Sequence, residues 1–336
     1  MPAYARNRKS MLTHHARFIL CIATAMSTML LSSVAPAQQY PHKPIRFIVP
    51  FPPGGATDVI SRVVGQKLHD ALGQQIIIDS RGGGATVVGT ELAARAAPDG
   101  HTIFLGTFGF ATTPALHRNL PYDVVRDFAP VSQIAQGMLV LAVHPSLPVK
   151  SVGELIAMAK AKGDRINFGT SGGGTSTSLA GILLQSMTGI QMTEVPYKGS
   201  GPGLTGLLAG EVNIAFFSSV AALPFAKAGK LRILGVTSAK RTSLLPDVPT
   251  IAESGTPGYE LSQWYGIILP RRAPPQIVSR LHNEFVRIMH RDDVREVFAA
   301  QGLDATATSP AEFAAFIASE VKKWSRVLKE KDTRRD

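Results

Sequence analysis

An apolar segment, a proline- and glycine-rich turn and an amphipathic segment follow one another in residues 45–68, and this succession limits the fold most strongly. Residues 45–49 are apolar and rich in β-branched side chains, which predicts a buried strand. Residues 50–55 contain three prolines and two glycines, which end the strand. From Thr57 onward, apolar residues recur at helical spacing as far as Leu68. A strand that leads through a glycine turn into a helix is typical of α/β proteins.

The same succession returns in residues 166–187, INFGTSGGGTSTSLAGILLQSM. In both places the first amides of the helix lack intrahelical partners, and the positive end of the helix dipole lies beside the turn. Such a helix end binds anions. We therefore expect two anion-facing turns, one in each of two lobes, that close on one small acidic ligand. The alternative is that these are ordinary tight α/β loops in which glycine serves only the turn.

The N-terminal residues carry the pattern of a secretory signal peptide. Four basic residues precede or begin an apolar run over 18–34, and Ala-Pro-Ala at 35–37 supplies a cleavage signal. We predict a signal peptide over 1–37 and export to the periplasm. A retained membrane anchor is the alternative, which a run of 17 residues with several Ser and Thr disfavours. The single cysteine, Cys21, lies in this leader, so we expect no disulfide and no cysteine metal site in the mature chain.

After the leader, apolar strand-like and helical segments alternate, which predicts lobes built on mostly parallel sheets flanked by helices. Residues 131–134 and 138–143 each have the pattern of a strand, and the second is expected to carry the chain out of the first lobe. A return near 259–267 makes a two-segment hinge that allows closure. The expected boundaries are 38–141 and 262–336 for lobe 1, which is discontinuous, and 142–261 for lobe 2.

Charge and motifs exclude several classes of partner. The formal net charge falls from +11 to +7 without the four basic residues of the leader, and a basic surface favours encounter with anions. Basic residues are scattered without aromatic interleaving, which argues against nucleic acid. No phosphate-binding loop, dinucleotide fingerprint or metal-ligand spacing occurs, so we expect no cofactor and no metal.

One enzyme signal competes with a binding role. Ser171 lies in a G-x-S-x-G run between a predicted strand and a predicted helix, as a nucleophile elbow does. Asp247 and His282 follow in the chain order of such hydrolases. No HGGG-like oxyanion segment precedes them, and glycine-rich runs match this motif readily. A secreted serine hydrolase therefore stays as the alternative function, and an adaptor without a ligand is a third class.

Several motifs, in order along essentially the whole mature chain, resemble one known family. They include VPFPPGGATD at 49–58, INFGTSGGGTSTSLAG at 166–181, VPYKGSGPGL at 195–204 and LPDVPTIAESG at 245–255. The chain resembles the Bug (TctC-like) extracytoplasmic solute receptors of tripartite tricarboxylate transporters. The resemblance implies a two-lobed periplasmic-binding-protein fold of type II, a small organic acid or amino acid as ligand, and delivery to membrane permease subunits. We further expect a monomer.

The resemblance also implies which residues hold the ligand. Phe51 would cover it, the first turn would hold one end, and the second turn would hold a carboxylate from lobe 2. The carried-over residues are Phe51, Gly55, Ala56, Thr57 and Asp58 in the first turn, Ser171, Gly174, Thr175 and Ser176 in the second, and Thr107, Tyr197, Ser218 and Trp264 as weaker candidates.

Two residues keep alternative roles. Asp58 either caps its helix or binds a ligand ammonium group, which would select an amino acid. Arg81 follows the second predicted strand in a run, Asp79 to Ala85, that departs from the family's usual Asn-Arg-Pro-Gly-Ala-Gly-Gly-like sequence. It either pairs with a ligand carboxylate or lies on the surface as an ordinary arginine.

Overall fold

A computed structural model describes residues 40–54, 56–117, 119–162, 166–242 and 244–330. The predicted signal peptide therefore lies outside the described residues, as does Gly55 of the first turn. Contacts group the described residues from Lys43 onward into one compact unit.

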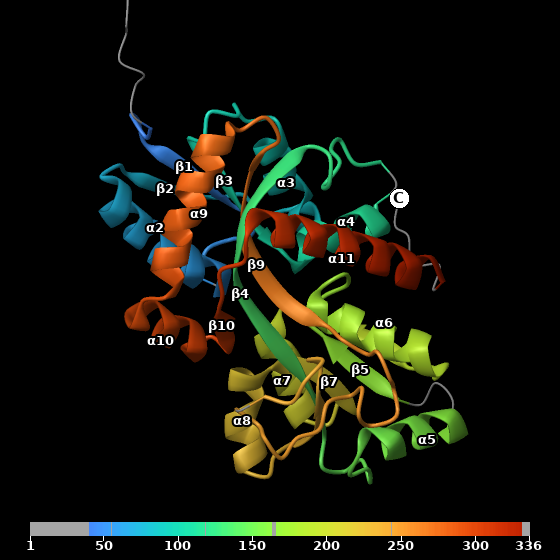
Figure 1. Cartoon of the computed structure of the whole chain (residues 1–336). Coiled ribbons are helices and arrows are strands. Elements are labelled where there is room, and N and C mark those ends of the chain that lie inside the picture. The colour runs from blue at the N-terminus through green and yellow to red at the C-terminus, as the bar shows by residue number, and fades with distance from the viewer. Residues whose placement is uncertain (1–39, 55, 118, 163–165, 243, 331–336) are drawn as a thin grey trace, which may run out of the picture. The chain divides into compact units, whose positions relative to one another are not determined.

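Strands and helices alternate along most of this unit, as the sequence predicts (Figure 1). The elements are β1 (Ile45–Val49), α2 (Ala56–Leu72), β2 (Ile76–Ser80), the 3₁₀ turn η1 (Gly84–Thr86), α3 (Val87–Ala94), β3 (Thr102–Thr107), α4 (Phe108–Leu116), β4 (Phe128–Val143), α5 (Val152–Lys162), β5 (Asn167–Thr170), α6 (Ser176–Thr188), β6 (Thr193–Pro196), α7 (Ser200–Leu208), β7 (Ile214–Ser218), α8 (Ser219–Lys227), β8 (Arg232–Val236), β9 (Ser262–Pro270), α9 (Pro275–Met289), α10 (Asp292–Ala300), β10 (Leu303–Ala305) and α11 (Pro310–Glu330).

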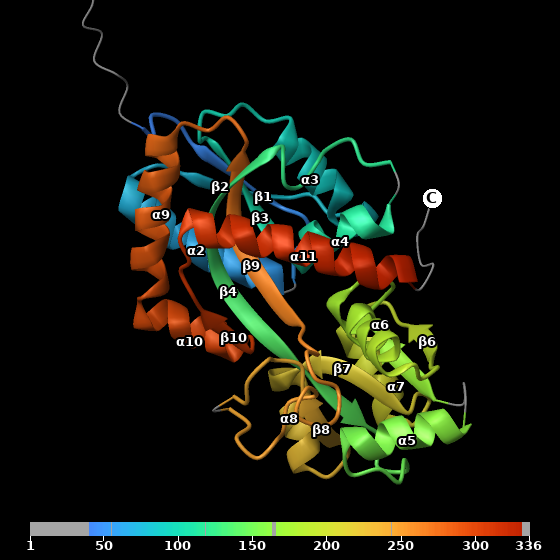
Figure 2. The same ribbon diagram turned by 45° about the vertical axis from the view of Figure 1, so that its right-hand side comes forward.

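Strand β4 belongs to both lobes. Its residues 128–138 pair with β9, and its residues 139–143 pair with β7 and β8 (Figures 1 and 2). The sequence predicted two separate strands here, over 131–134 and 138–143, and the structure corrects this to one strand of 16 residues. From this pairing we define lobe 1 as the part with β1, β2, β3, β9, β10 and residues 128–138 of β4, and lobe 2 as the part with β5 to β8 and residues 139–143 of β4.

The sheet of each lobe is parallel away from the hinge and antiparallel at it. Strands β2, β1 and β3 are parallel neighbours, as are β6, β5 and β7. Strands β4 and β9 run antiparallel to each other because one carries the chain out of lobe 1 and the other carries it back. The predicted two-lobed α/β fold with a two-segment hinge is confirmed, although antiparallel strands are more numerous than expected.

Aromatic side chains of the C-terminal helix α11 anchor it to lobe 1. Trp324 meets Phe108 of α4 edge-on at 5.2 Å between ring centroids. Phe313 and Phe316 pack edge-on against Trp264 of β9, at 5.6 and 5.7 Å. Such pairs add about 0.5–1.5 kcal/mol each beyond the burial of their area. The last helix therefore fixes both the start of α4 and the returning hinge strand.

Candidate functional site

The first turn, between β1 and α2, is held by one carboxylate. Asp58 accepts a hydrogen bond from the Gly54 amide at Oδ2 (3.1 Å) and one from Arg62 Nε at Oδ1 (2.9 Å). The bond from Arg62 is the main cause that lowers the pKa of Asp58, and the Gly54 amide adds to it against the opposing effect of burial. Each oxygen thus has a partner within the protein. This arrangement favours the capping role of Asp58 over the ammonium-binding role.

Two glycines that follow β2 lie close to this turn, Gly82 in the loop and Gly89 in α3. A β-carbon at Gly82 would lie 2.9 Å from Pro52 Cδ, and one at Gly89 would lie 3.0 Å from Pro50. Only glycine permits such close approach of the two backbones. Phe51, which was predicted to cover the ligand, is 37 % exposed at the tip of the turn.

The remaining predicted residues of this region differ in exposure. Thr57 is buried and Ala56 is half-buried at the start of α2. Arg81 donates from Nε to Asp79 Oδ1 (2.7 Å). Asp79 also binds Arg46, so Arg81 is part of a surface ion-pair cluster.

The second turn, between β5 and α6, is held by hydroxyl groups. Thr175 is the N-cap residue of α6, where its Oγ1 accepts from the Ser178 amide (3.4 Å) and donates to Gly172 O (2.7 Å). Thr177 Oγ1 accepts from the Ser171 amide (2.9 Å) and lies 2.8 Å from Ser171 Oγ and 2.9 Å from Thr175 Oγ1. The sequence reasoning missed Thr177. The only signal for it was the run of alternating Thr and Ser after the glycines.

The second turn also contacts lobe 1. Gln263 of β9 donates from Nε2 to Ser176 Oγ (2.9 Å), and Ser176 is buried. Gly174 has a φ of +77°, and a β-carbon there would lie 2.9 Å from Leu116 Cδ1 at the end of α4. The predicted anion-binding turn of lobe 2 therefore faces lobe 1.

Two further predicted residues end strands beside helix N-termini. Thr107 ends β3 before α4, and Ser218 ends β7 before α8. Both have extended backbone, and neither side chain caps its helix. Thr107 Oγ1 is buried and has no hydrogen-bond partner among the described residues. A buried hydroxyl without a partner costs about 1–3 kcal/mol.

The other weaker candidates have structural partners. Tyr197 donates from its hydroxyl to Glu211 Oε2 (3.0 Å), and its ring lies over Gly206 of α7. Burial and the neighbouring Glu211 raise the pKa of Tyr197. Trp264 is fully buried between β9 and α11. In this arrangement both side chains stabilise their own lobe.

The serine hydrolase alternative finds no support. Among the described residues, Ser171 Oγ is bonded to hydroxyls of Thr175 and Thr177, and no histidine bonds to it. His282 lies in α9 of lobe 1, and its buried Nδ1 has no hydrogen-bond partner in the described part of the chain. A catalytic histidine needs one nitrogen on the serine and an orienting acid on the other. Ser171 is therefore a structural member of the second turn.

Neither a metal-binding cluster nor a membrane-spanning helix is found among the described residues. No group of three or more His, Cys, Asp or Glu side chains there is placed to hold a metal ion. No helix there combines the length and apolar character needed to cross a membrane.

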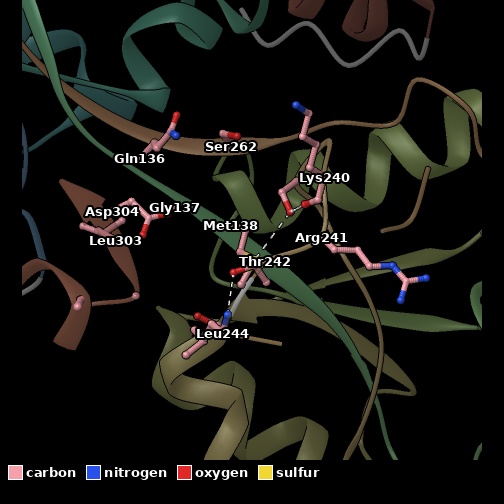
Figure 3. A pocket seen from close by; sticks show the side chains of 14 residues that line it. Gln136, Gly137, Met138, Lys240, Arg241, Thr242, Leu244, Ser262, Leu303 and Asp304 are labelled. Carbon is pink, nitrogen blue, oxygen red and sulfur yellow. Dashed lines mark hydrogen bonds between the residues drawn. The ribbon is translucent and has the colours of Figure 1, made fainter. Parts of the chain in front are cut away.

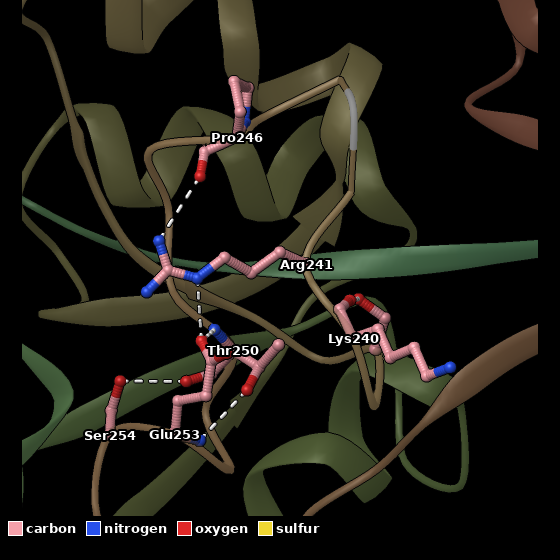
Figure 4. A network of polar contacts seen from close by, with 7 residues as sticks. Lys240, Arg241, Pro246, Thr250, Glu253 and Ser254 are labelled. Atoms are coloured by element: carbon pink, nitrogen blue, oxygen red, sulfur yellow. Dashed lines mark hydrogen bonds and ion pairs between the residues drawn. The ribbon is translucent and has the colours of Figure 1, made fainter.

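A cavity of about 610 Å³ lies at the hinge, and residues of β4, β9 and β10 line it (Figure 3). We call it the hinge pocket. Its lining shares no residue with the predicted site, although Ser219 follows the predicted Ser218. Arg241 lies at its rim, but its guanidinium binds Glu253 Oε2 (3.0 Å) and Pro246 O (3.4 Å) in a network with Thr250 (Figure 4). The lining residues are Gln136, Gly137, Met138, Ser219, Ser238, Lys240, Arg241, Thr242, Leu244, Ser262, Ala299, Gly302, Leu303 and Asp304.

Comparison with known proteins identifies the family. The model of the tripartite tricarboxylate transporter family receptor (TctC) matches residues 60–333. Protein BugT of Bordetella pertussis is 35% identical over 316 residues, which cover 94% of this chain and 97% of BugT.

Solved structures agree with this assignment. A structure titled R. palustris Rpa4515 with adipate has a TM-score of 0.75 and 35% identity, and the match covers 86% of this chain and 97% of that one. MatC (Rpa3494) from Rhodopseudomonas palustris with bound malate has a TM-score of 0.73 and 29% identity, over 86% of this chain and 100% of that one. This chain therefore belongs to the tripartite tricarboxylate transporter family receptors, the TctC or Bug group of solute-binding receptors.

Proposed function

We propose that this receptor captures a small organic carboxylate between its lobes in the periplasm and delivers it to the permease subunits of a tripartite tricarboxylate transporter. It acts as a monomer and catalyses no reaction. The observation that carries the proposal is the pair of glycine turns, each at the N-terminus of a helix and each in a different lobe. The contacts of Ser176 and Gly174 with lobe 1 support a ligand position between the turns.

The proposed ligand contacts follow from this position. Backbone amides of the first turn and of the second turn hold carboxylate oxygens, and Thr107 and Ser218 supply hydroxyls from the adjoining strand ends. Phe51 covers the ligand from lobe 1. The proposed lobes keep the expected bounds of 38–141 with 262–336, and 142–261. Lobe 1 then ends three residues after the pairing of β4 changes from β9 to β7 and β8. The leader over 1–37 directs the chain to the periplasm. The proposed ligand-binding residues are Phe51, Gly55, Ala56, Thr57, Thr107, Ser171, Gly174, Thr175, Ser176 and Ser218.

The binding free energy of a micromolar ligand requires contacts from both turns. Micromolar affinity corresponds to about 8 kcal/mol. A hydrogen bond to a charged group contributes about 1.5–3 kcal/mol, and a partly buried helix terminus contributes up to ~2 kcal/mol. Four or five such donors across two lobes reach this affinity after ordering costs, whereas the donors of one lobe do not.

Dicarboxylates are the first candidates for the ligand. Each turn lies at the positive end of a helix dipole, and the two turns lie in different lobes, so the pair suits a molecule with an anionic group at each end. The related structures with adipate and with malate hold molecules of this kind.

The test is a calorimetric screen of the mature chain against malate, adipate, glutamate and citrate, with an esterase assay beside it. Saturable binding of a carboxylate without turnover supports the proposal. Ester hydrolysis that disappears in Ser171→Ala would instead establish the hydrolase. A chain that binds none of these acids and hydrolyses nothing would contradict the proposed ligand class.

A further inference from the structure

A glycine of lobe 1 lies directly against a helix of lobe 2. Gly302 occupies the turn between α10 and β10, and α8 begins at Ser219. A β-carbon at Gly302 would lie 2.8 Å from Val220 Cγ2, 3.2 Å from Ser219 Oγ and 3.7 Å from the Val220 amide nitrogen. The two lobes therefore meet here with no room for a side chain at position 302. We call this the Gly302 contact.

Local structure explains why glycine occupies this position. Gly302 has a φ of +73° and follows the last turn of α10, where its amide donates to Ala299 O (2.9 Å). A glycine of positive φ is the common way to end a helix. Val220 cannot move aside cheaply, because a β-branched side chain in a helix has one preferred χ1 rotamer.

The electrostatics of the two helix ends favour the contact. The C-terminus of α10 carries a partial negative charge, and the N-terminus of α8 carries a partial positive charge. Ser218 is the N-cap residue of α8 but makes no side-chain capping bond. Ser219 is fully buried, and its Oγ has no hydrogen-bond partner among the described residues. The turn at Gly302 in lobe 1 thus covers the N-terminus of α8 in lobe 2.

The contact lies at the hinge. Gly302 and Ser219 both line the hinge pocket, together with Gly137 and Met138 of β4 and Ser262 of β9. These hinge residues lie where β4 and β9 pass from one lobe to the other. A rotation of the lobes about these strands must change the fit of Gly302 on α8.

We propose that the Gly302 contact is an inter-lobe stop that fixes the angle between the lobes, and that any side chain at position 302 shifts the receptor away from this angle. The effect on lobe angle concerns the chain without ligand. Its consequence for ligand affinity rests on the proposed function, since the angle then determines how well the two glycine turns meet one ligand.

The experiment measures the distance between the lobes in the mature, ligand-free chain. The chain has no cysteine after the leader, so Val125→Cys in lobe 1 and Lys160→Cys in lobe 2 introduce two exposed sites for spin labels. Pulsed electron paramagnetic resonance then gives the distance distribution. We expect Gly302→Ala to reduce the population at the original distance by about fivefold or more, because overpacking a close contact is costly. The double variant Gly302→Ala/Val220→Ala should restore the population at the original distance, because the smaller side chain at position 220 makes room for the new methyl group.

A matched control separates the contact from backbone strain. Gly73 ends α2 in lobe 1 with a φ of +68°, and a β-carbon there would meet nothing within 4 Å. Gly73→Ala therefore introduces the same left-handed strain without an inter-lobe clash, and the distance distribution should stay unchanged. Val220→Leu adds bulk from the other side without altering any glycine, and should shift the distribution as Gly302→Ala does.

Two results would overturn the proposal. One is an unchanged distribution in both Gly302→Ala and Val220→Leu, and the other is a shift of equal size in Gly73→Ala. If Gly302→Ala does not fold, Val220→Leu decides alone. Titration with malate and adipate forms a separate arm: a wild-type chain that binds neither acid counts against the proposed dicarboxylate class, while the distance measurement still decides the role of Gly302.

Discussion

The two glycine turns each lead from a strand into a helix but are stabilised by different kinds of side chain. A charged side chain, Asp58, holds the first turn through the Gly54 amide and Arg62, and the tip of that turn is exposed. Neutral hydroxyls of Ser171, Thr175 and Thr177 hold the second turn, which is half-buried. A carboxylate beside an anion site repels the ligand unless a cation neutralises it, and Arg62 supplies that cation. The neutral cluster needs no such compensation.

In the proposed site, this difference gives the turns different parts in binding. The second turn brings only dipoles to the ligand and also contacts lobe 1, so it should carry most of the affinity. The first turn should set the response to pH and salt. Four substitutions test this division, beginning with the one of largest expected effect.

Thr177→Val should disrupt the second turn most strongly. It keeps the shape of the side chain but leaves the Ser171 amide and two hydroxyls without their common partner. The free energy of unfolding should fall by about 1–3 kcal/mol, and affinity for the carboxylate found in the screen should fall at least tenfold. Chemical denaturation and calorimetry measure the two effects. Thr177→Ser keeps the hydroxyl and serves as the control; equal losses in both variants would contradict the role of that hydroxyl.

Ser176→Ala should remove the hydrogen bond from Gln263 that joins the second turn to lobe 1. Affinity should fall by about tenfold, which corresponds to roughly 1.4 kcal/mol, a typical value for one hydrogen bond to a charged or buried partner. Ser178→Ala is the matched control in the same helix, because Ser178 Oγ is buried without a partner among the described residues. Calorimetry on the two variants should separate them, and equal affinities would remove Ser176 from the site.

Asp58→Asn should have a smaller effect, limited to the first turn. An amide oxygen still accepts from Gly54, so affinity for a dicarboxylate should change less than threefold. A large, selective loss of glutamate binding would show instead that Asp58 binds an ammonium group.

The pH dependence of the first turn follows from the same carboxylate. The pKa of Asp58 is lowered in the folded chain, so its stabilising contribution is complete above its unfolded pKa, near 4, and is lost as pH falls through the lower folded value. Thermal unfolding of wild type and Asp58→Asn between pH 7 and pH 2.5 should converge towards the acid end. Curves that stay parallel would contradict this linkage.

Arg81→Gln should have the smallest effect. Arg81 is paired with Asp79 on an exposed surface, and such pairs are worth about 0–1 kcal/mol. Ligand affinity should be unchanged within twofold by calorimetry. A tenfold loss would place the guanidinium on the ligand.

Local sequence patterns were sufficient for the parts of the site that depend on local structure. The strand, glycine turn and helix around Asp58 and around Thr175 could be predicted because apolar periodicity and glycine placement act over a few residues. The family resemblance supplied the same residues by position. The role of Thr177 was missed because its hydroxyl meets the Ser171 amide and the Thr175 hydroxyl through the path of the loop, which the spacing of residues along the sequence does not reveal.

Long-range contacts explain the other misses. Residues 135–137 appeared to separate two strands, but pairing with β9 on one side and β10 on the other continues β4 through them. Gln263 and Gly302 carried no signal because their partners, Ser176 and Val220, are 80 or more positions away in the chain. Trp264, a weaker candidate for the ligand site, is buried by packing against Phe313 of α11, 49 positions away, which no local pattern indicates.

The continuity of β4 through both lobes has a mechanical consequence. If the lobes were joined only by flexible loops, the angle between them would have no preferred value. Here the crossing strands are bonded to each other up to Met138, and irregular register with β9 or β8 occurs only near 130–135 and at Leu141/Ala142. A change in the angle between the lobes must therefore twist two hydrogen-bonded strands together, and the irregular register near 130–135 and at Leu141/Ala142 marks where that twist is least constrained.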